Sequence, residues 1–206
     1  MTTRPEPPRR GRPRDPATDR AILDAALALF LEKGVEGTSI QAIAARAGVG
    51  KPTVYRRGSS KEELIAQAIE HGRGDHPERS VDDTVSVAEA IEHSLPASAA
   101  LIAEPGFRAL LARMLGTTHT HPRIMEASWE HYILPRRRAA ALLLERAVQE
   151  GSVDADADFD ALIDMMVGAV VYRVLQPEPL DRGRAERYLR SVYRQVGLLP
   201  PTHDKG

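Results

Sequence analysis

Residues 51–56 bring together side chains that suit the grooves and backbone of DNA. Lys51 and Arg56 can donate hydrogen bonds to guanine O6 and N7 or to phosphate. The Pro52 ring and the Thr53 methyl group can pack against thymine methyl groups, and the Tyr55 hydroxyl suits a phosphate oxygen. If this segment is a short helix fixed by its buried residues, these side chains point outward together and can reach base edges.

Two nearby positions are expected at helix starts, where phosphate binds well. Thr38, with Gln41 three residues later, has the capping-box pattern of a helix N-terminus. Ser60 and Glu63 repeat that pattern, and Lys61 lies beside them. Because backbone N–H groups and the helix dipole at such ends attract phosphate, we assign Thr38 and Lys61 to contacts with the DNA backbone.

Helical apolar spacing predicts the elements that position these groups. Helices are expected at residues 15–33, 38–47 and 51–57, and a further helix is expected from Ser60 to about Gly72. Gly34 would stop the first helix, and Gly48 permits the positive φ of a tight turn. The pattern therefore predicts a three-helix, helix-turn-helix DNA-binding domain over residues 15–72.

A basic segment precedes this domain. Residues 1–14 hold many arginines and prolines and little to bury, so a disordered basic arm is expected there. Arg10 and Arg12 can enter a narrow minor groove, although a solubilising tail is the alternative. Residues 1–61 carry 12 Lys and Arg against 6 Asp and Glu, and the remainder carries 16 against 23. This asymmetry favours contact with a polyanion at the N-terminal end only.

Residues 83–198 have helical periodicity throughout and no alternating strand pattern of useful length. One long helix is expected over residues 121–150, kinked at Pro135. The aromatic and flexible apolar residues of this region can line a cavity for a small apolar or amphipathic ligand, although each one alone suits plain core packing. The candidates are Phe107, Leu110, Leu111, Met114, Met125, Trp129, Tyr132, Met165 and Tyr172.

Two apolar stripes near the C-terminus are candidates for pairing with a second copy of the chain. Helices are expected at residues 158–175 and 184–196, and their stripes could equally belong to the core of one chain. The predicted interface consists of Leu162, Met166, Ala169, Val170, Arg173, Tyr188, Leu189, Val192 and Tyr193.

Several classes of function find no support. The chain has no cysteine, and it has no glycine-rich phosphate loop, nucleophile elbow or convincing acid pair, so we expect neither an enzyme nor a bound cofactor. His119, His121 and His131 lack a carboxylate at metal-binding spacing, so no metal is expected. The polar N-terminus is unlike a signal peptide, and no apolar run approaches the ~18 residues of a membrane span, so a cytoplasmic protein without membrane contact is expected.

The first domain carries a set of residues whose types and spacing can be compared with known families. It resembles the DNA-binding signature of the tetracycline-repressor (TetR/AcrR-like) family over about residues 17–66. The resemblance rests on Gly34, Thr38, Ile40, Ile43, Ala44, Ala47, Gly48, Val49, Lys51, Val54, Tyr55, Ser60, Lys61, Glu62, Glu63 and Leu64. It implies an all-α homodimer with a helical ligand-binding and dimerisation domain, a palindromic double-stranded DNA operator, and repression relieved by a small molecule.

Two alternatives and one departure accompany this resemblance. A helical small-molecule binding protein with an incidental basic end, or an activator with the same DNA-binding domain, would share the pattern. The family usually has an aromatic residue and a proline where this chain has Gly58 and Ser59. The sequence therefore predicts either a gap at Gly58 or another residue that fills it, and a gain in stability on Gly58→Trp.

Overall fold

The computed structural model describes residues 15–72 and 84–201 of the chain, and all regular structure in these ranges is helical. The all-α class is therefore confirmed. Arg10 and Arg12 lie outside the described residues. The elements in chain order are α1 (Pro16–Gly37), α2 (Ile40–Ala47), α3 (Lys51–Tyr55), α4 (Lys61–Gly72), α5 (Val87–Ala103), α6 (Pro105–Thr117), α7 (Pro122–Ser128), the π-helical turn η1 (Trp129–Ile133), α8 (Leu134–Gln149), α9 (Phe159–Val174) and α10 (Arg182–Gln195).

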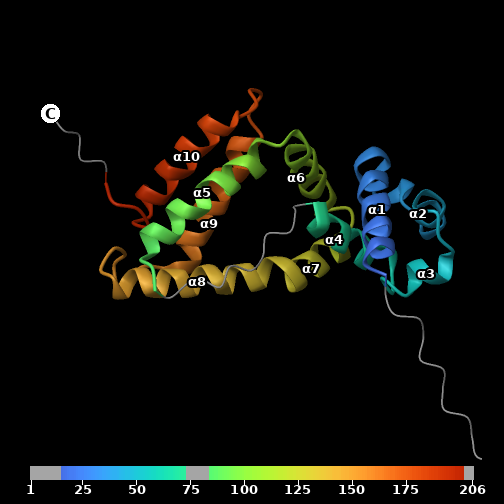
Figure 1. Ribbon diagram of the computed structural model, residues 1–206, viewed down its shortest axis with the longest axis horizontal. Helices are drawn as coiled ribbons and strands as arrows, with labels where there is room; N and C mark the ends of the chain where they lie inside the picture. The colour runs from blue at the N-terminus through green and yellow to red at the C-terminus, as the bar shows by residue number, and fades with distance from the viewer. Residues whose placement is uncertain (1–14, 73–83, 202–206) are drawn as a thin grey trace, which may run out of the picture.

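We call α1–α4 the head and α5–α10 the body (Figure 1). The head begins with a cap, because the Asp15 side chain accepts a hydrogen bond of 3.1 Å from the Ala17 N–H and Pro16 occupies the first turn. Gly34 has φ 68°, a conformation that favours glycine, and α1 is kinked there.

One apolar core holds the head together. Val54 is fully buried in this core and anchors α3. A helix of five residues is not stable by itself, so the core sets the orientation of α3. The buried members of the core are Ile22, Leu23, Ala25, Ala26, Leu29, Ile43, Ala44, Val54, Leu64 and Ala68.

A second apolar cluster joins the head to the body. Helix α4 packs against α1 within the head and against α7 of the body (Figure 1). Burying each large side chain of the cluster contributes about 1.5–3 kcal/mol, so α4 is firmly held on both sides. The cluster consists of Phe30, Val35, Ile65 and Ile69 from the head and Leu110 and Ile124 from the body.

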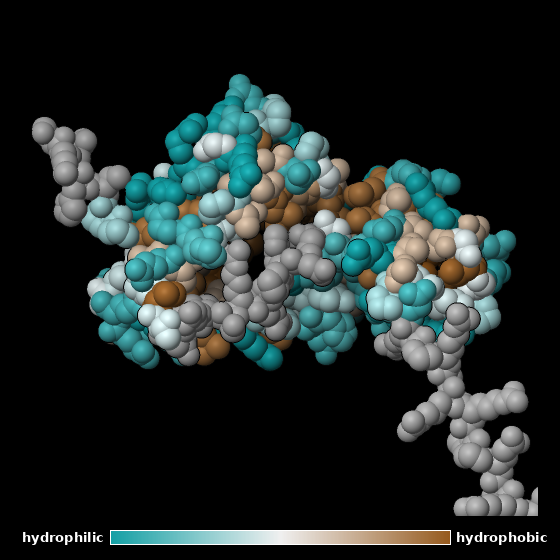
Figure 2. Space-filling model, in the orientation of Figure 1, coloured by the Kyte–Doolittle hydropathy of each residue, from teal (hydrophilic) through white to brown (hydrophobic). Residues whose placement is uncertain are grey.

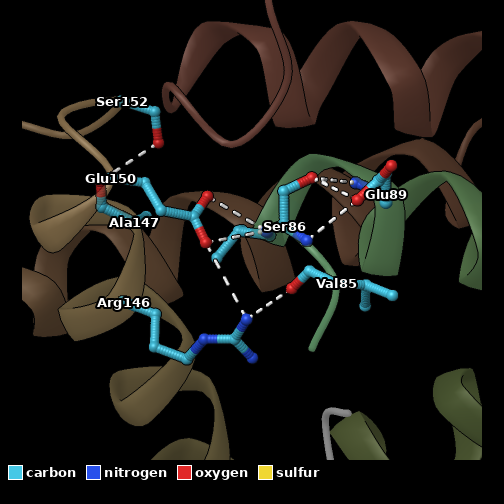
Figure 3. Close-up of polar contacts among 8 residues, drawn as sticks. Val85, Ser86, Glu89, Arg146, Ala147, Glu150 and Ser152 are labelled. Atoms are coloured by element: carbon cyan, nitrogen blue, oxygen red, sulfur yellow. Dashed lines mark hydrogen bonds and ion pairs between the residues drawn. The ribbon is translucent and has the colours of Figure 1, made fainter. Parts of the chain in front are cut away.

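Polar contacts fix the start of α5 to the end of α8 (Figure 3). Ser86 and Glu89 form a capping box, in which the Glu89 carboxylate accepts from the Ser86 N–H at 2.9 Å. Both carboxylate oxygens of Glu150 accept from the first N–H of α5 at 3.1 Å, and Arg146 Nη2 donates to the Val85 oxygen at 2.6 Å. Helix N–H groups without in-helix partners are thus satisfied by the body itself.

The body core lies between α5, α8, α9 and α10, and α5 packs along α10 (Figure 1). Its fully buried centre includes Leu95, Leu144 and Leu198. Figure 2 shows hydrophobic residues gathered toward the middle of the molecule and hydrophilic residues along its outer edges. Within the described ranges, no helix is long and apolar enough to cross a membrane.

The helix expected over residues 121–150 is present as a continuous helical run from Pro122 to Gln149, but a π-helical turn takes the place of the simple kink expected at Pro135. The structure has α7, then η1, then α8, and Pro135 lies in the first turn of α8. The Leu134 N–H donates to the Trp129 oxygen five residues earlier, which is the π-helical pattern. A proline has no N–H to donate, and the wider turn before Pro135 accommodates it, so the chain changes its helical register there.

Candidate functional site

The turn between α2 and α3 has the geometry that its sequence predicts. Gly48 caps α2 in the left-handed conformation, with φ 68° and ψ 28°, and the Val49 N–H donates to the Ala44 oxygen at 3.0 Å. Gly50 is the N-cap residue of α3, and Pro52 lies in the first turn. Together with buried Val54, this turn fixes the angle at which α3 leaves α2.

Five of the residues predicted to read DNA are on or beside α3, around its buried anchor. Lys51, Pro52, Tyr55 and Arg56 are exposed and Thr53 is half-buried. The Lys51 Nζ donates to Gln41 Oε1 at 3.2 Å, and Arg56 Nη2 donates to Thr53 Oγ1 at 3.1 Å.

The two cations of this surface keep their charge free for an anion. Among the described residues, neither Lys51 nor Arg56 has a carboxylate partner, since both are held by neutral oxygens. Arg46 on α2 differs, because it donates both terminal nitrogens to Glu32 at 2.7 and 2.8 Å. The hydrogen bond from Arg46 lowers the pKa of Glu32, so that pair remains ionised. The surface of α3 therefore carries the uncompensated positive charge.

Thr38, which is assigned to a phosphate contact because a helix start is expected there, is not the cap of α2 and its side chain is buried, so this assignment is corrected. Thr38 is 1% exposed and its hydroxyl donates to the Gly34 oxygen at 2.7 Å. Helix α2 begins one residue later than expected, and the exposed Ser39 is its N-cap, accepting from the Ala42 N–H at 3.1 Å. Of the adjacent pair Thr38 and Ser39, the first is bound to the kinked residue Gly34 and the second caps α2.

Lys61 is half-buried at the start of α4, as the capping pattern indicates. Its Nζ donates to the Val35 oxygen at 3.3 Å, which leaves two of its three donors for another acceptor. Ser60 Oγ accepts from the Glu63 N–H at 3.0 Å, and the Glu63 carboxylate accepts from the Ser59 N–H at 2.8 Å. The two hydrogen bonds from Ser59 lower the pKa of Glu63.

The body contains a partly open, mainly apolar cavity of about 530 Å³ lined by residues from α5 to α10, with Met125 of α7 and Ile133 of η1 among them. This volume lies in the range of small-molecule sites. Five of the predicted pocket residues line it, namely Phe107, Leu110, Leu111, Met114 and Met125.

The other four predicted pocket residues do not line this cavity, so their assignment is corrected. Trp129, Met165 and Tyr172 are 46%, 54% and 71% exposed. Tyr132 is half-buried beside α4, where burial and then the charge of Glu70 raise its pKa. On α9 the cavity is lined instead by Ile163, Met166, Val167, Val170 and Val171, and one residue turns a helix by about 100°.

Sequence reasoning missed most of the lining. The new members are mainly aliphatic residues, which carry no signal beyond helical periodicity, and two arginines from the start of α8. They include Ile91, Leu101, Ile102, Arg136, Arg137, Leu143, Ile163 and Val167.

The predicted dimer residues fall into two groups. Met166, Val170, Leu189 and Tyr193 line the cavity, so they face the interior of one chain instead of a partner. The remaining residues are half-buried, and Leu162 packs against the body core. The list of half-buried residues is Leu162, Ala169, Arg173, Tyr188 and Val192.

Polar contacts tie α9 to α10. Tyr188 Oη donates to the Ala169 oxygen at 3.1 Å, and the Arg173 guanidinium lies 5.4 Å from the centre of the Tyr188 ring. This arrangement orients an outer face of α9 on which Met165, Tyr172 and Leu175 are exposed.

Comparison with known proteins decides the family. Residues 22–68 match the model of bacterial regulatory proteins of the tetR family, and residues 81–192 match the tetracyclin repressor-like C-terminal domain. The chain belongs to the TetR family. TetR-family proteins are non-enzymatic DNA-binding transcription factors, so the resemblance and the expectation of a non-enzymatic regulator are confirmed.

Individual members of the TetR family are similar to this protein in sequence over most of its length. An uncharacterised helix-turn-helix regulator of Bacillus subtilis, YdeS, is 33% identical over 81% of this chain and 83% of its own length. The DNA-binding transcriptional repressor TetR of Mycobacteroides abscessus is 26% identical over 78% of this chain and 84% of its own. The fold matches that of the regulator FadR of Bacillus subtilis in complex with stearoyl-CoA, with a TM-score of 0.66, 18% identity, and coverage of 89% and 98%.

Of the two alternatives that the sequence leaves open at Gly58, the structure shows the one in which another residue fills the space. Gly58 is buried, and a Cβ placed on it would already lie 3.3 Å from the Leu64 Cβ. Leu64 is itself fully buried, so the core of the head is closed at this point without an aromatic ring. The local packing at this point is thus a glycine against a leucine.

The three histidines singled out in the sequence make separate contacts. His121 Nε2 is 2.8 Å from Glu36 Oε1, which joins the body to the head and lowers the pKa of Glu36. His131 packs edge-on against Tyr132, with ring centres 6.2 Å apart, and His119 is exposed.

Proposed function

We propose that this TetR-family regulator is a repressor that binds a palindromic operator as a homodimer and leaves it when a small apolar or amphipathic molecule fills the body cavity. The observation that carries the proposal is that α4 belongs to both functional parts. It packs on α1 in the head and on α7 in the body, so a change in the body can reach the DNA-binding surface.

The DNA contacts are assigned to the surface of α3 and its surroundings. Lys51 and Arg56 donate to guanine or phosphate, Pro52 and Thr53 pack on thymine methyl groups, and Tyr55 binds phosphate. Their exposure and the neutral partners of both cations support this role.

Further contacts with the DNA backbone come from the ends of neighbouring helices and from the N-terminal arm. Lys61 and the exposed N-cap of α2 at Ser39 lie at helix starts, where phosphate is favoured. Arg10 and Arg12 reach the minor groove in this proposal, which their sequence alone supports.

The homodimer is assigned to the outer face of α9 together with α10. Met165, Tyr172 and Leu175 lie at helical spacing and are exposed, although large apolar side chains normally gain by leaving water. Gly168 lies between them with no atom within 4 Å of where its Cβ would be, which leaves room for a close approach. The two heads of such a dimer would bind two DNA half-sites that are related by a two-fold axis.

Operator selection from random duplexes, followed by a salt titration on the selected and a scrambled sequence, tests this function. We expect one palindromic site bound at least a thousandfold more tightly than the scrambled DNA at physiological salt. Footprinting should then show two half-sites about one helical turn apart or a multiple of it. If every duplex is bound equally at every salt concentration, the regulator has no specific operator and the proposal is wrong.

A further inference from the structure

The lining of the cavity is mainly apolar, and its charged residues come from the start of α8. Among the described residues that line it, Arg136 and Arg137 are the only charged ones. Both are cationic, and no lining carboxylate opposes them. A bound molecule with an apolar body would therefore meet positive charge only where it contacts the start of α8.

Arg137 is firmly held by other side chains. Its Nη2 is 2.7 Å from Asp160 Oδ1, and its Nη1 is 2.5 Å from Asp164 Oδ1. Its guanidinium lies 5.8 Å from the centre of the Trp129 ring, and its side chain is 17% exposed. Because two carboxylates and an aromatic face already bind this guanidinium, its charge is compensated before any ligand arrives.

Arg136 has one carboxylate partner, and that partner belongs to the head. Its Nη1 donates to the Tyr132 oxygen at 2.9 Å, and its Nη2 is hydrogen-bonded and ion-paired to Glu70 Oε1 on α4. The Arg136 side chain is 40% exposed and that of Glu70 is 19% exposed, so the pair lies partly open to water on the Arg136 side. The same guanidinium thus lines the cavity and connects α8 to the helix shared by head and body.

We propose that the ligand is an acid with an apolar chain, and that its carboxylate replaces Glu70 as the partner of Arg136. A carboxylate cannot enter an apolar site without a compensating cation, and a guanidinium binds it in a planar, two-pronged geometry. A protonated amine would be repelled, because the charged residues that line the cavity, Arg136 and Arg137, are both cations. This inference rests on the ligand cavity of the proposed function and adds the chemical class of the ligand.

The exchange also gives the ligand a route to the DNA-binding head. While Arg136 holds Glu70, α4 is tied to α8, and when the ligand occupies Arg136 this tie is broken. Ligand and Glu70 compete for one guanidinium, so each weakens the binding of the other by the same factor. Removing the Glu70 charge should therefore strengthen the binding of the acid, although Glu70 does not line the cavity.

Calorimetry on the full-length protein tests the ligand class with dodecanoic acid, dodecanol and dodecylamine, each below its micelle concentration. Trp129, the only tryptophan, gives a second readout by fluorescence. We expect the wild type to bind the acid at least tenfold more tightly than the alcohol or the amine. Equal affinity for acid and alcohol would overturn the proposal.

Variants separate the roles of the two partners. Arg136→Gln should lose the preference for the acid, Arg136→Lys should keep it in part, and Glu70→Gln should bind the acid about three- to tenfold more tightly than the wild type. Arg138→Gln is the matched control, since Arg138 is exposed on the same helix and does not line the cavity. An unchanged acid affinity in Glu70→Gln would refute the exchange.

The effect of the acid on DNA binding is measured in a separate experiment. With the selected operator, the acid should weaken DNA binding by the wild type and have a smaller effect on Glu70→Gln. If no operator is found but the acid still binds through Arg136, the proposed regulatory function fails and the ligand class stands. If the operator is bound and the acid is not preferred, the inference about the ligand fails alone.

Discussion

Arg113 on α6 donates a hydrogen bond of 2.7 Å from its Nη2 to the main-chain oxygen of Leu31 on α1. Leu31 lies in the last turn before Gly34 breaks the regular helix, and carbonyl groups at a helix end lack in-helix partners. The Arg113 Nη1 is also 3.6 Å from the position that a Cβ on Gly34 would take. A body residue therefore satisfies the end of the first head helix, in addition to the apolar contacts of α4.

Arg113→Ala is expected to lower the free energy of unfolding by about 0.5–1.5 kcal/mol, because the Leu31 oxygen loses its charged donor. Urea unfolding followed by circular dichroism measures the difference. Arg123→Ala on α7 is the control, since it removes the same kind of side chain at an exposed position on a different helix. A loss in Arg123→Ala as large as in Arg113→Ala would show that the hydrogen bond is not the cause.

Lys51→Ala should weaken operator binding and reduce its dependence on salt. A lysine that neutralises one phosphate contributes about 0.9 to the slope of log affinity against log salt, so a dimer should lose about two units. If Lys51 reads a guanine instead, the loss should depend on the base at one position and leave the slope nearly unchanged. Fluorescence anisotropy over a range of salt concentrations distinguishes the two.

Arg187→Ala serves as the control for charge alone. Arg187 is exposed on α10, away from the surface of α3, so the same loss of charge should leave the salt slope as in the wild type. Tyr55→Phe should weaken binding with little change in slope, because it removes a hydrogen bond and no charge. Wild-type affinity in both Lys51→Ala and Tyr55→Phe would mean that α3 does not contact DNA.

The pH dependence of stability should include a contribution from Glu63. Hydrogen bonds from Ser59 lower the pKa of Glu63 below its value in the unfolded chain. The stabilisation is therefore present above the unfolded pKa and is lost as the pH falls through the folded one. Wild type and Glu63→Gln should differ in urea stability at pH 6 and converge toward pH 3. A difference that stays constant over this range would contradict the ionic origin.

Met165→Glu or Tyr172→Glu should shift the protein from dimer to monomer, because either places a charge in the proposed apolar interface. Sedimentation velocity measures the shift at several protein concentrations. Leu142→Glu is the matched control, since Leu142 is 61% exposed but belongs to α8. If Leu142→Glu dissociates the dimer and the α9 variants do not, the interface is on α8.

Gly58→Trp is now expected to lower the melting temperature. The Cβ position is already 3.3 Å from Leu64, and forcing larger groups into a closed core typically costs about 1–3 kcal/mol. Gly58→Ala should cost less, because only one methyl group must be accommodated. Thermal unfolding followed by circular dichroism ranks the three proteins. A higher melting temperature for Gly58→Trp would show that the space beside Gly58 is not closed by Leu64.

The sequence predicted the head better than the body for a physical reason. Capping residues, Gly48 and the proline in the first turn of α3 each act over a few residues, so their patterns remain visible without tertiary information. Thr38 shows the limit of such signals, since it is bound to the kinked residue Gly34 and α2 starts one residue later than expected.

The face of a body helix depends on contacts that lie far apart in the sequence. Met165 and Met166 are adjacent and chemically alike, yet one is exposed and the other lines the cavity. Periodicity finds the stripe but does not give its direction when both sides of a helix are apolar. The contact of Arg136 with Glu70 spans 66 residues, and no local pattern announces it.

The π-helical turn η1 also determines which way α8 faces. Each residue of an α-helix adds about 100° of rotation about the helix axis. The one additional residue in the π-helical turn therefore determines the direction in which each side chain of α8 points. Deleting a single residue between 129 and 133 would leave the composition of α8 intact and swing Arg136 out of reach of both Glu70 and the cavity. The site thus depends on the length of this turn as well as on the Trp129 ring that contacts Arg137.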